Sequence, residues 1–162
     1  METIFDKIRE ARLKAPVDVD ALSEELGIEV NYEDFGDEIS GELVRKNGSF
    51  EINVNMRHAR SRQRFTIAHE LGHFLYHRNL IGEGVNDNKA YRTSSHAEYY
   101  NSSIKPYHET EANKFAASLL MPENLVIKMW NENNGIDKMA ENFQVSKDAM
   151  TIRLNSLGFH VD

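Results

Sequence analysis

Apolar and polar positions repeat with two different periods along the chain, and each period predicts one kind of element. Between residues 61 and 77, apolar or small side chains recur mainly three or four positions apart, which is typical of one face of an amphipathic helix. They are Phe65, Ala68, Leu71, Gly72 and Leu75. Glycine inside a helix costs about 1 kcal/mol relative to alanine. Gly72 therefore indicates that another backbone or a ligand comes close at this point.

The helical period returns between residues 109 and 121. Its apolar stripe consists of Ala112, Phe115, Ala116, Leu119 and Leu120. Proline cannot continue a helix, so this helix must end before Pro122. Further helices are predicted at residues 3–14, 18–26, 123–131, 136–143 and 146–157. The predicted caps are Asp18 and Ser146, and Gly27 ends the second helix.

Alternation with a period of two predicts strands in the first third of the chain. Residues 28–32 alternate like a half-buried strand, and residues 41–46 and 49–55 flank Asn47-Gly48. Asn-Gly is the strongest short hairpin signal, because both positions accept a positive φ. We therefore predict an α+β fold that is mainly helical, with a small antiparallel sheet.

Composition narrows the class of protein without naming it. The chain has 162 residues, of which 40% are hydrophobic and 28% are charged, so one domain spanning residues 1–162 is expected. Within it we distinguish an N-terminal part (1–57), a central part (58–122, including an irregular connection at 79–108) and a C-terminal helical part (123–162). There is no cysteine, so any bound metal must be held by nitrogen and oxygen.

Charge and hydropathy indicate the compartment and the kind of partner. The net charge of −7 argues against direct nucleic-acid binding, which needs a basic face, and is compatible with a basic protein partner. The first residues have no apolar core of a signal peptide, and no run approaches about 20 apolar residues. A cytoplasmic protein that does not enter a membrane is expected.

The candidate chemistry lies in the pentapeptide His69-Glu70-Leu71-Gly72-His73. On a helix, His69 and His73 point from the same face and can hold one zinc ion together. Glu70 points to the side, where it can act on a water molecule held by the metal. The chemistry of two imidazoles suits Zn²⁺, and Mn²⁺ or Fe²⁺ stay open alternatives.

Such a site needs a third protein ligand, and the second helix offers two glutamates. Glu109 lies three and seven positions before Ala112 and Ala116, close to the buried stripe, whereas Glu111 lies off it. A carboxylate aimed at the core needs a partner, and a metal provides one. Glu109 is the preferred third ligand and Glu111 the fallback. Both could instead be solvated glutamates in the first helical turn, where the helix dipole stabilises negative charge.

Two segments resemble one known family. Residues 64–77 (RFTIAHELGHFLYH) and residues 109–122 (ETEANKFAASLLMP) together look like the ImmA/IrrE family of zinc metallopeptidases. The similarity covers about residues 15–158. It implies a zincin-like fold, His69, His73 and Glu109 as zinc ligands, and Glu70 as the catalytic base. It also implies a DNA-binding helix-turn-helix repressor as the protein substrate.

Three further expectations concern the surroundings of the site. In the zincin arrangement an edge strand often receives the substrate, and the candidates are Glu51, Ile52, Asn53, Val54 and Asn55, although this strand could pair internally. His77 continues the face of the two histidines and is expected to support the site rather than bind metal. No spacing selects one oxyanion donor from the connection. Its candidates are Tyr91, Arg92, His96, Tyr99, Tyr100, Tyr107 and His108.

The C-terminal helices have a helix-turn-helix spacing between Met139 and Leu154. Only Lys147 and Arg153 are basic there, so packing or substrate docking is preferred over DNA contact. An alternative to the peptidase remains: a non-catalytic, metal-stabilised module that sequesters a repressor or antitoxin. Structural zinc sites normally have four protein ligands, and only three are visible here.

Overall fold

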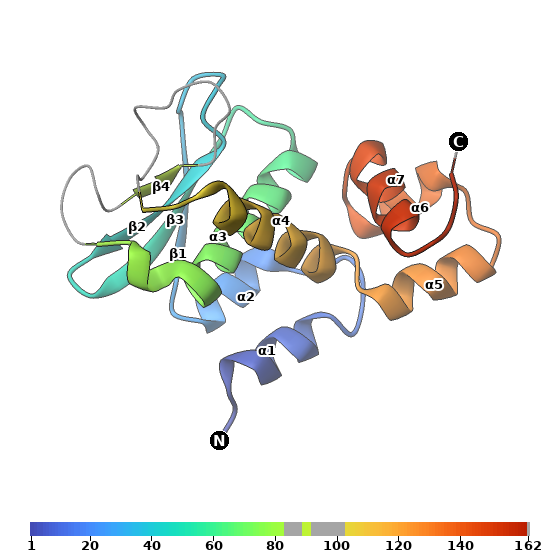
Figure 1. Cartoon of the computed structure of the whole chain (residues 1–162), viewed down its shortest axis with the longest axis horizontal. Helices are drawn as coiled ribbons and strands as arrows, with labels where there is room; N and C mark the ends of the chain where they lie inside the picture. The colour runs from blue at the N-terminus through green and yellow to red at the C-terminus, as the bar shows by residue number, and fades with distance from the viewer. Residues whose placement is uncertain (83–88, 92–102, 162) are drawn as a thin grey trace.

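A four-stranded sheet lies on one side of the molecule and helices cover it (Figure 1). The computed structural model describes residues 1–82, 89–91 and 103–161. The strands are β1 (Glu29–Glu33), β2 (Gly41–Lys46), β3 (Ser49–Asn55) and β4 (Lys89–Tyr91), in the order β1-β3-β2-β4. The β2–β3 hairpin has the predicted bounds, and φ is 51° at Asn47 and 79° at Gly48. The Asn-Gly signal therefore predicted this turn correctly.

The sheet is mixed rather than antiparallel, and this corrects two expectations. Residues 51–55 pair in parallel with residues 29–33 of β1, and residues 49–54 pair antiparallel with β2. The prediction that Glu51, Ile52, Asn53, Val54 and Asn55 form an edge strand is wrong, because β3 has a neighbour on both sides. Its backbone groups are used within the sheet, so it cannot take up a substrate as an added strand.

Seven α-helices and one short 3₁₀ turn are found in the described residues, and the predicted α+β class is confirmed. They are α1 (Ile4–Ala11), α2 (Val19–Glu25), α3 (Arg60–His77), η1 (Arg78–Leu80), α4 (Pro106–Leu120), α5 (Glu123–Asn131), α6 (Ile136–Phe143) and α7 (Lys147–Ser156). Two predicted caps are confirmed: the side chain of Asp18 accepts from the Ala21 N–H, and that of Ser146 accepts from the Ala149 N–H.

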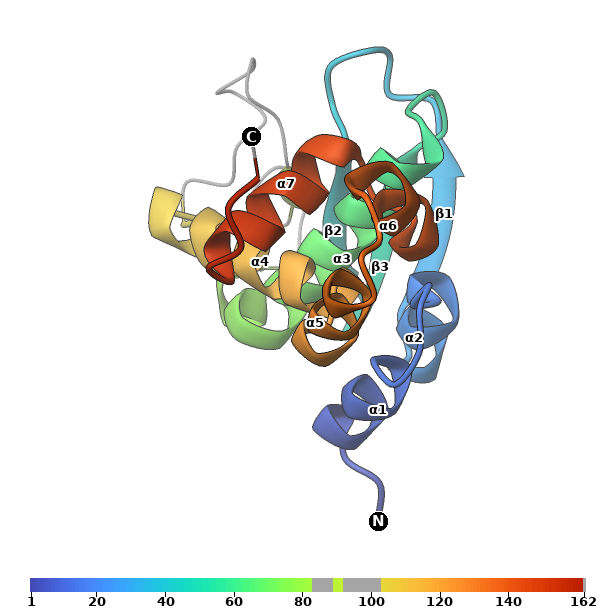
Figure 2. The same ribbon diagram turned by 90° about the vertical axis from the view of Figure 1, so that its right-hand side faces the viewer.

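Helix α3 lies between the sheet and α4 (Figures 1 and 2), and eleven of its eighteen residues are buried. Apolar side chains such as Ile67 and Leu71 pack toward the sheet residues Leu43 and Ile52 in one core. A Cβ on Gly72 would lie 3.0 Å from the Ala112 Cα, so α3 and α4 approach each other closely at this residue. The close backbone approach predicted for Gly72 is confirmed.

Helices α5, α6 and α7 lie on the other side of α3 and α4 from the sheet (Figures 1 and 2). The buried Arg64 of α3 donates to the carbonyl oxygens of Gln144 (3.2 Å) and Phe143 (3.4 Å), where α6 ends. A guanidinium at a helix C-terminus satisfies carbonyls that have no partner inside the helix. Arg153 of α7 donates to the Met121 carbonyl oxygen at 3.0 Å. These bonds fix the C-terminal helices against α3 and the end of α4.

None of the helices in the described part of the chain is long and apolar enough to cross a membrane.

Candidate metal centre

Three side chains from α3 and α4 converge on one point. The Nε2 atoms of His69 and His73 lie 3.0 Å apart. The Glu109 carboxylate of α4 lies between them, with Oε2 at 3.1 Å from His69 Nε2 and Oε1 at 2.9 Å from His73 Nε2. Both imidazoles are fully buried. The spacing of four residues on α3 and the closeness of α4 at Gly72 produce this convergence.

The size and chemistry of this group fit a divalent cation. Ligand atoms about 2.0–2.1 Å from a tetrahedral zinc lie about 3.3 Å from one another. The three donor pairs here are separated by 2.9 to 3.1 Å, so a few tenths of an ångström of opening would admit the ion. Two nitrogens and one carboxylate oxygen are also the donor set that leaves a fourth position open.

Hydrogen bonds on the far side of each imidazole set which nitrogen carries the proton. His69 Nδ1 lies 2.8 Å from the Asn113 side-chain oxygen, which can only accept, so Nδ1 donates and the Nε2 lone pair faces the centre. His73 Nδ1 lies 2.9 Å from His77 Nδ1. With the His73 Nε2 lone pair turned to the centre, His73 Nδ1–H donates to His77. Such outer partners hold a metal-binding imidazole in its orientation.

Glu109 is held in its charged form. Without a metal, a proton on each Nε2 takes the place of the ion. Burial by itself would raise the pKa of the Glu109 carboxyl, but in the metal-free chain hydrogen bonds from these Nε2–H groups outweigh it and lower the pKa to about 2. A carboxylate that stays ionised at neutral pH beside two imidazoles is suited to bind a cation. The preference for Glu109 over Glu111 as the group nearest the histidines agrees with this geometry.

Glu70 lies on α3 between the two histidines and is fully buried. Its Oε1 is 3.9 Å from His69 Nε2, and one oxygen lies within 4.8 Å of donor atoms of both histidines. The carboxylate therefore borders the point where the three donors meet without occupying it. This is the position of a proton acceptor for a molecule held at that point.

A second cluster of His77, His108 and Glu111 lies beside the first, with one donor atom of each within 4.8 Å of the others. Its hydrogen bonds make it a poor metal site. His108 Nδ1 accepts from the Lys105 backbone N–H (2.8 Å), and His77 Nδ1 faces His73, so a proton remains on each Nε2. His77 Nε2 lies 3.5 Å from Glu111 Oε1. Burial, reinforced by the neighbouring His73, lowers the pKa of His77 and favours its neutral form.

Sequence reasoning missed Asn113, which fixes the orientation of His69. The signal was its position four residues after Glu109, on the same face of α4. Of the candidate oxyanion donors, Tyr107 is 63% exposed and His108 is buried. The side chain of Tyr91, together with Arg92, His96, Tyr99 and Tyr100, lies outside the described residues.

Comparison with known proteins gives a family and several similar solved structures. The family described as IrrE N-terminal-like domain, Peptidase_M78, matches residues 23–155. A Mycobacterium tuberculosis transcriptional regulator has a similar fold, with a TM-score of 0.54 and 16% sequence identity. The match covers 96% of this chain and 42% of that chain, so this chain spans less than half of the regulator's length. No curated protein matches the sequence.

Proposed function

The chain belongs to the Peptidase_M78 family, and from this membership and the geometry of the centre we propose that it is a zinc-dependent endopeptidase. Its proposed substrate is a DNA-binding helix-turn-helix repressor, cut at a specific site. The single observation that carries the proposal is the convergence of His69, His73 and Glu109 beside the buried Glu70.

In this proposal His69, His73 and Glu109 hold the metal. A zinc ion there would supply Lewis acidity and lower the pKa of water toward about 7. Asn113 and His77 keep the two imidazoles in the tautomers that leave Nε2 free. Mn²⁺ and Fe²⁺ bind the same donor atoms and are alternatives to zinc. Elemental analysis distinguishes the three metals.

Glu70 is the proposed general base. It takes one proton from water as the water oxygen attacks the scissile carbonyl carbon, and it delivers that proton to the departing amine nitrogen when the C–N bond breaks. Atoms balance, because the water oxygen stays on the new carboxyl and the proton ends on the new amine. The burial of Glu70 excludes bulk water and strengthens its interaction with developing charge.

The net charge and the similar fold are compatible with a regulatory protein as the substrate. The net charge of −7 favours approach of a basic protein, and DNA-binding repressors are basic on the face that contacts phosphates. A solved structure with a similar fold is a transcriptional regulator, which is compatible with a role in the control of transcription. The two basic residues of the helix-turn-helix segment are engaged within the chain: Lys147 pairs with Asp137 at 3.0 Å and Arg153 binds the Met121 carbonyl.

The test is incubation of the purified chain with helix-turn-helix repressors encoded beside its gene, with and without a chelator. Discrete fragments that disappear with chelator and with Glu70→Gln are expected. Mass spectrometry of the fragments gives the cleaved bond. Intact repressor that co-purifies with the metal-loaded chain would instead indicate the non-catalytic module that sequesters its partner.

A further inference from the structure

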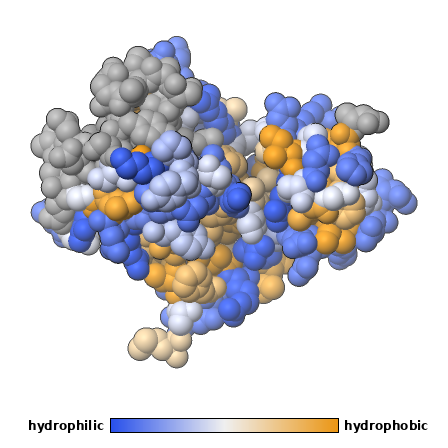
Figure 3. Space-filling view, in the orientation of Figure 1, coloured by the Kyte–Doolittle hydropathy of each residue, from blue (hydrophilic) through white to orange (hydrophobic). Residues whose placement is uncertain are grey.

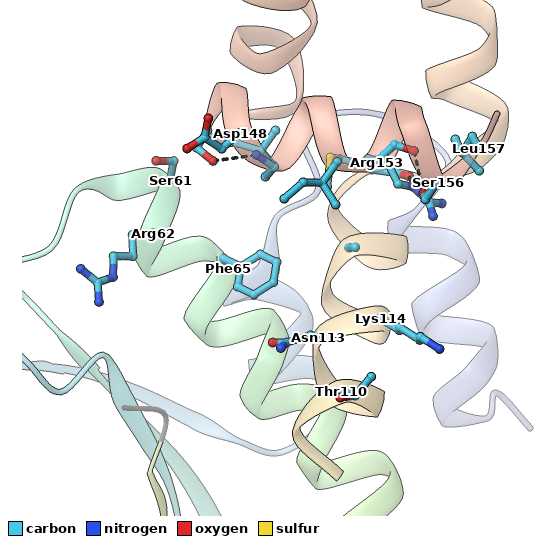
Figure 4. A pocket seen from close by; sticks show the side chains of 16 residues that line it. Ser61, Arg62, Phe65, Thr110, Asn113, Lys114, Asp148, Arg153, Ser156 and Leu157 are labelled. Carbon is cyan, nitrogen blue, oxygen red and sulfur yellow. Dashed lines mark hydrogen bonds between the residues drawn. The ribbon is translucent and has the colours of Figure 1, made fainter. Parts of the chain in front are cut away.

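A groove of about 980 Å³ lies between α3, α4 and α7, at the boundary between the metal-centre helices and the C-terminal helices (Figure 4). It is at the upper end of the roughly 300–1,000 Å³ of ordinary ligand pockets. Residues 61–65, 110–121 and 145–157 contribute its lining. The bonds of Arg64 to α6 and of Arg153 to Met121 hold its walls at a fixed separation.

The groove continues the line of the metal centre. On α3, Phe65 precedes His69 by one turn on the same face, and Phe65 points into the groove (Figure 4). On α4, Asn113 lines the groove and also holds the imidazole of His69 at 2.8 Å. A polypeptide that crosses the metal centre along the two helices therefore enters this groove within one helical turn.

The lining is mainly apolar and remains accessible. Phe65, Ile152 and Leu157 contribute to it, and Ile152 is 69% exposed. Apolar surface is visible on both sides of the boundary between α4 and the C-terminal helices (Figure 3). Covering an exposed isoleucine removes apolar surface from water, which is favourable, so these side chains favour an apolar occupant.

The rim of the groove has the opposite charge to the protein as a whole. Among the described residues that line it, Arg62, Lys114 and Arg153 are basic and Asp148 is acidic, in a chain whose net charge is −7. Arg62 and Lys114 leave the groove on opposite sides (Figure 4). Basic side chains around an apolar floor favour a segment in which acidic residues flank apolar ones.

We propose that this groove docks an acidic, apolar segment of the protein substrate that lies beside the scissile bond. The inference rests on the proposed function, because its occupant is the substrate of the metal centre. It also separates two parts of that substrate: the basic DNA-contacting face does not enter the groove, since Arg62 and Lys114 would repel it.

The test measures binding without turnover, in the Glu70→Gln chain. The probes are a fluorescein-labelled 12-residue peptide of leucine, isoleucine and glutamate, and a twin with lysine in place of glutamate. Fluorescence anisotropy is expected to give a Kd at least tenfold lower for the acidic peptide. Ile152→Asp should weaken that binding at least tenfold, and Lys114→Glu about threefold, with the second effect shrinking in 0.5 M salt as screening requires.

Matched controls lie outside the groove. Phe5→Asp changes another exposed apolar side chain (59% exposed), and Lys138→Glu reverses an exposed charge on α6. Both should leave the Kd within twofold. If Ile152→Asp lowers the thermal midpoint, Ile152→Ser replaces it. Three results would contradict the proposed docking surface. They are equal affinity for the two peptides, no saturable binding, and an equal loss of affinity in the control variants.

Cleavage of a repressor separates this inference from the proposed function. If the chain binds the acidic peptide in the groove but leaves every repressor intact, the proposed peptidase activity is contradicted and the docking surface is still supported. If Ile152→Asp and Lys114→Glu leave kcat/KM for repressor cleavage unchanged, the proposed peptidase activity is supported and the docking surface is contradicted. The expected result is at least a tenfold fall in kcat/KM for Ile152→Asp.

Discussion

The two ends of the α3–α4 pair differ, although the same two helices form both. At one end Gly72 and Ala112 bring the backbones so close that a Cβ on Gly72 would lie 3.0 Å from the Ala112 Cα, and the polar centre is buried. At the other end Phe65 and Ala117 face a groove closed by α7. Small residues thus allow a buried polar site at one end, and a large side chain beside a third helix makes an open apolar surface at the other.

This difference separates chemistry from recognition. The closed end holds two imidazoles and a carboxylate within 3.1 Å of one another, an arrangement that suits the metal binding and proton transfer proposed for it. The open end offers apolar area lined by charged side chains, among them Arg62, Lys114 and Asp148. Changes at the closed end should alter metal affinity and turnover, whereas changes at the open end should alter only substrate affinity.

The largest expected effect is that of Glu70→Gln. The amide cannot take a proton, so kcat for repressor cleavage should fall about 10³-fold, within the range of general base catalysis. Metal content should stay at the level of the parent chain, because Glu70 borders the donors without joining them. Single-turnover assays and elemental analysis check this. Full activity in this variant would contradict the role of Glu70.

Removal of the outer partner of His73 comes next. His77→Phe deletes the nitrogen that lies 2.9 Å from His73 Nδ1, and metal affinity should fall about 10- to 100-fold. His77→Asn should recover part of the loss, because its amide oxygen can accept from His73. Competition with a chromogenic chelator measures the affinities. The exposed His160→Phe is the control, and an equal loss in it would argue against a specific role for His77.

A smaller effect is expected where the helices touch. Gly72→Ala places a Cβ against the Ala112 backbone, so α3 and α4 must move apart by a few tenths of an ångström. Metal affinity should fall about three- to tenfold, while the gain of about 1 kcal/mol in helix propensity offsets part of the strain. Gly135→Ala is the control, because no atom lies within 4 Å of its added Cβ. The same chelator competition measures the metal affinity of both variants. An unchanged affinity in Gly72→Ala would show that metal binding does not require the close approach of α3 and α4.

The smallest effect is a pH dependence of the metal-free chain. Because the pKa of Glu109 is about 2, below its ordinary 4.5, its contribution to the free energy of unfolding is complete above about pH 4.5. It is lost as the pH falls toward 2. In chelator-treated protein the urea midpoint of the parent should therefore fall more steeply in this range than that of Glu109→Gln. Parallel profiles would contradict the hydrogen bonds that lower this pKa.

Local signals predicted most of the elements correctly and indicated which side chains lie together at the candidate centre. Asn47-Gly48 gave the bounds of the hairpin, and Ser146 gave the start of α7, because turn and cap chemistry act over a few residues. The position of Glu109 relative to the apolar stripe indicated which glutamate faces the histidines.

What the sequence did not predict depends on contacts between distant segments. The parallel pairing of β1 with β3 joins residues 22 positions apart, and alternation indicates a buried face without indicating how many neighbours a strand has. The groove likewise forms only when residues near 65, 113 and 152 are brought together by the packing of three helices. Neither feature has a local pattern of its own.

The most direct test of the central claim is metal stoichiometry after reconstitution and gel filtration. Inductively coupled plasma mass spectrometry should find about one metal ion per chain in the parent and in Glu70→Gln, and less than about a tenth of that in His73→Ala and Glu109→Ala. A parent chain without metal, or a Glu109→Ala chain that retains the parent's full content, would contradict the three-ligand centre from which the peptidase is proposed.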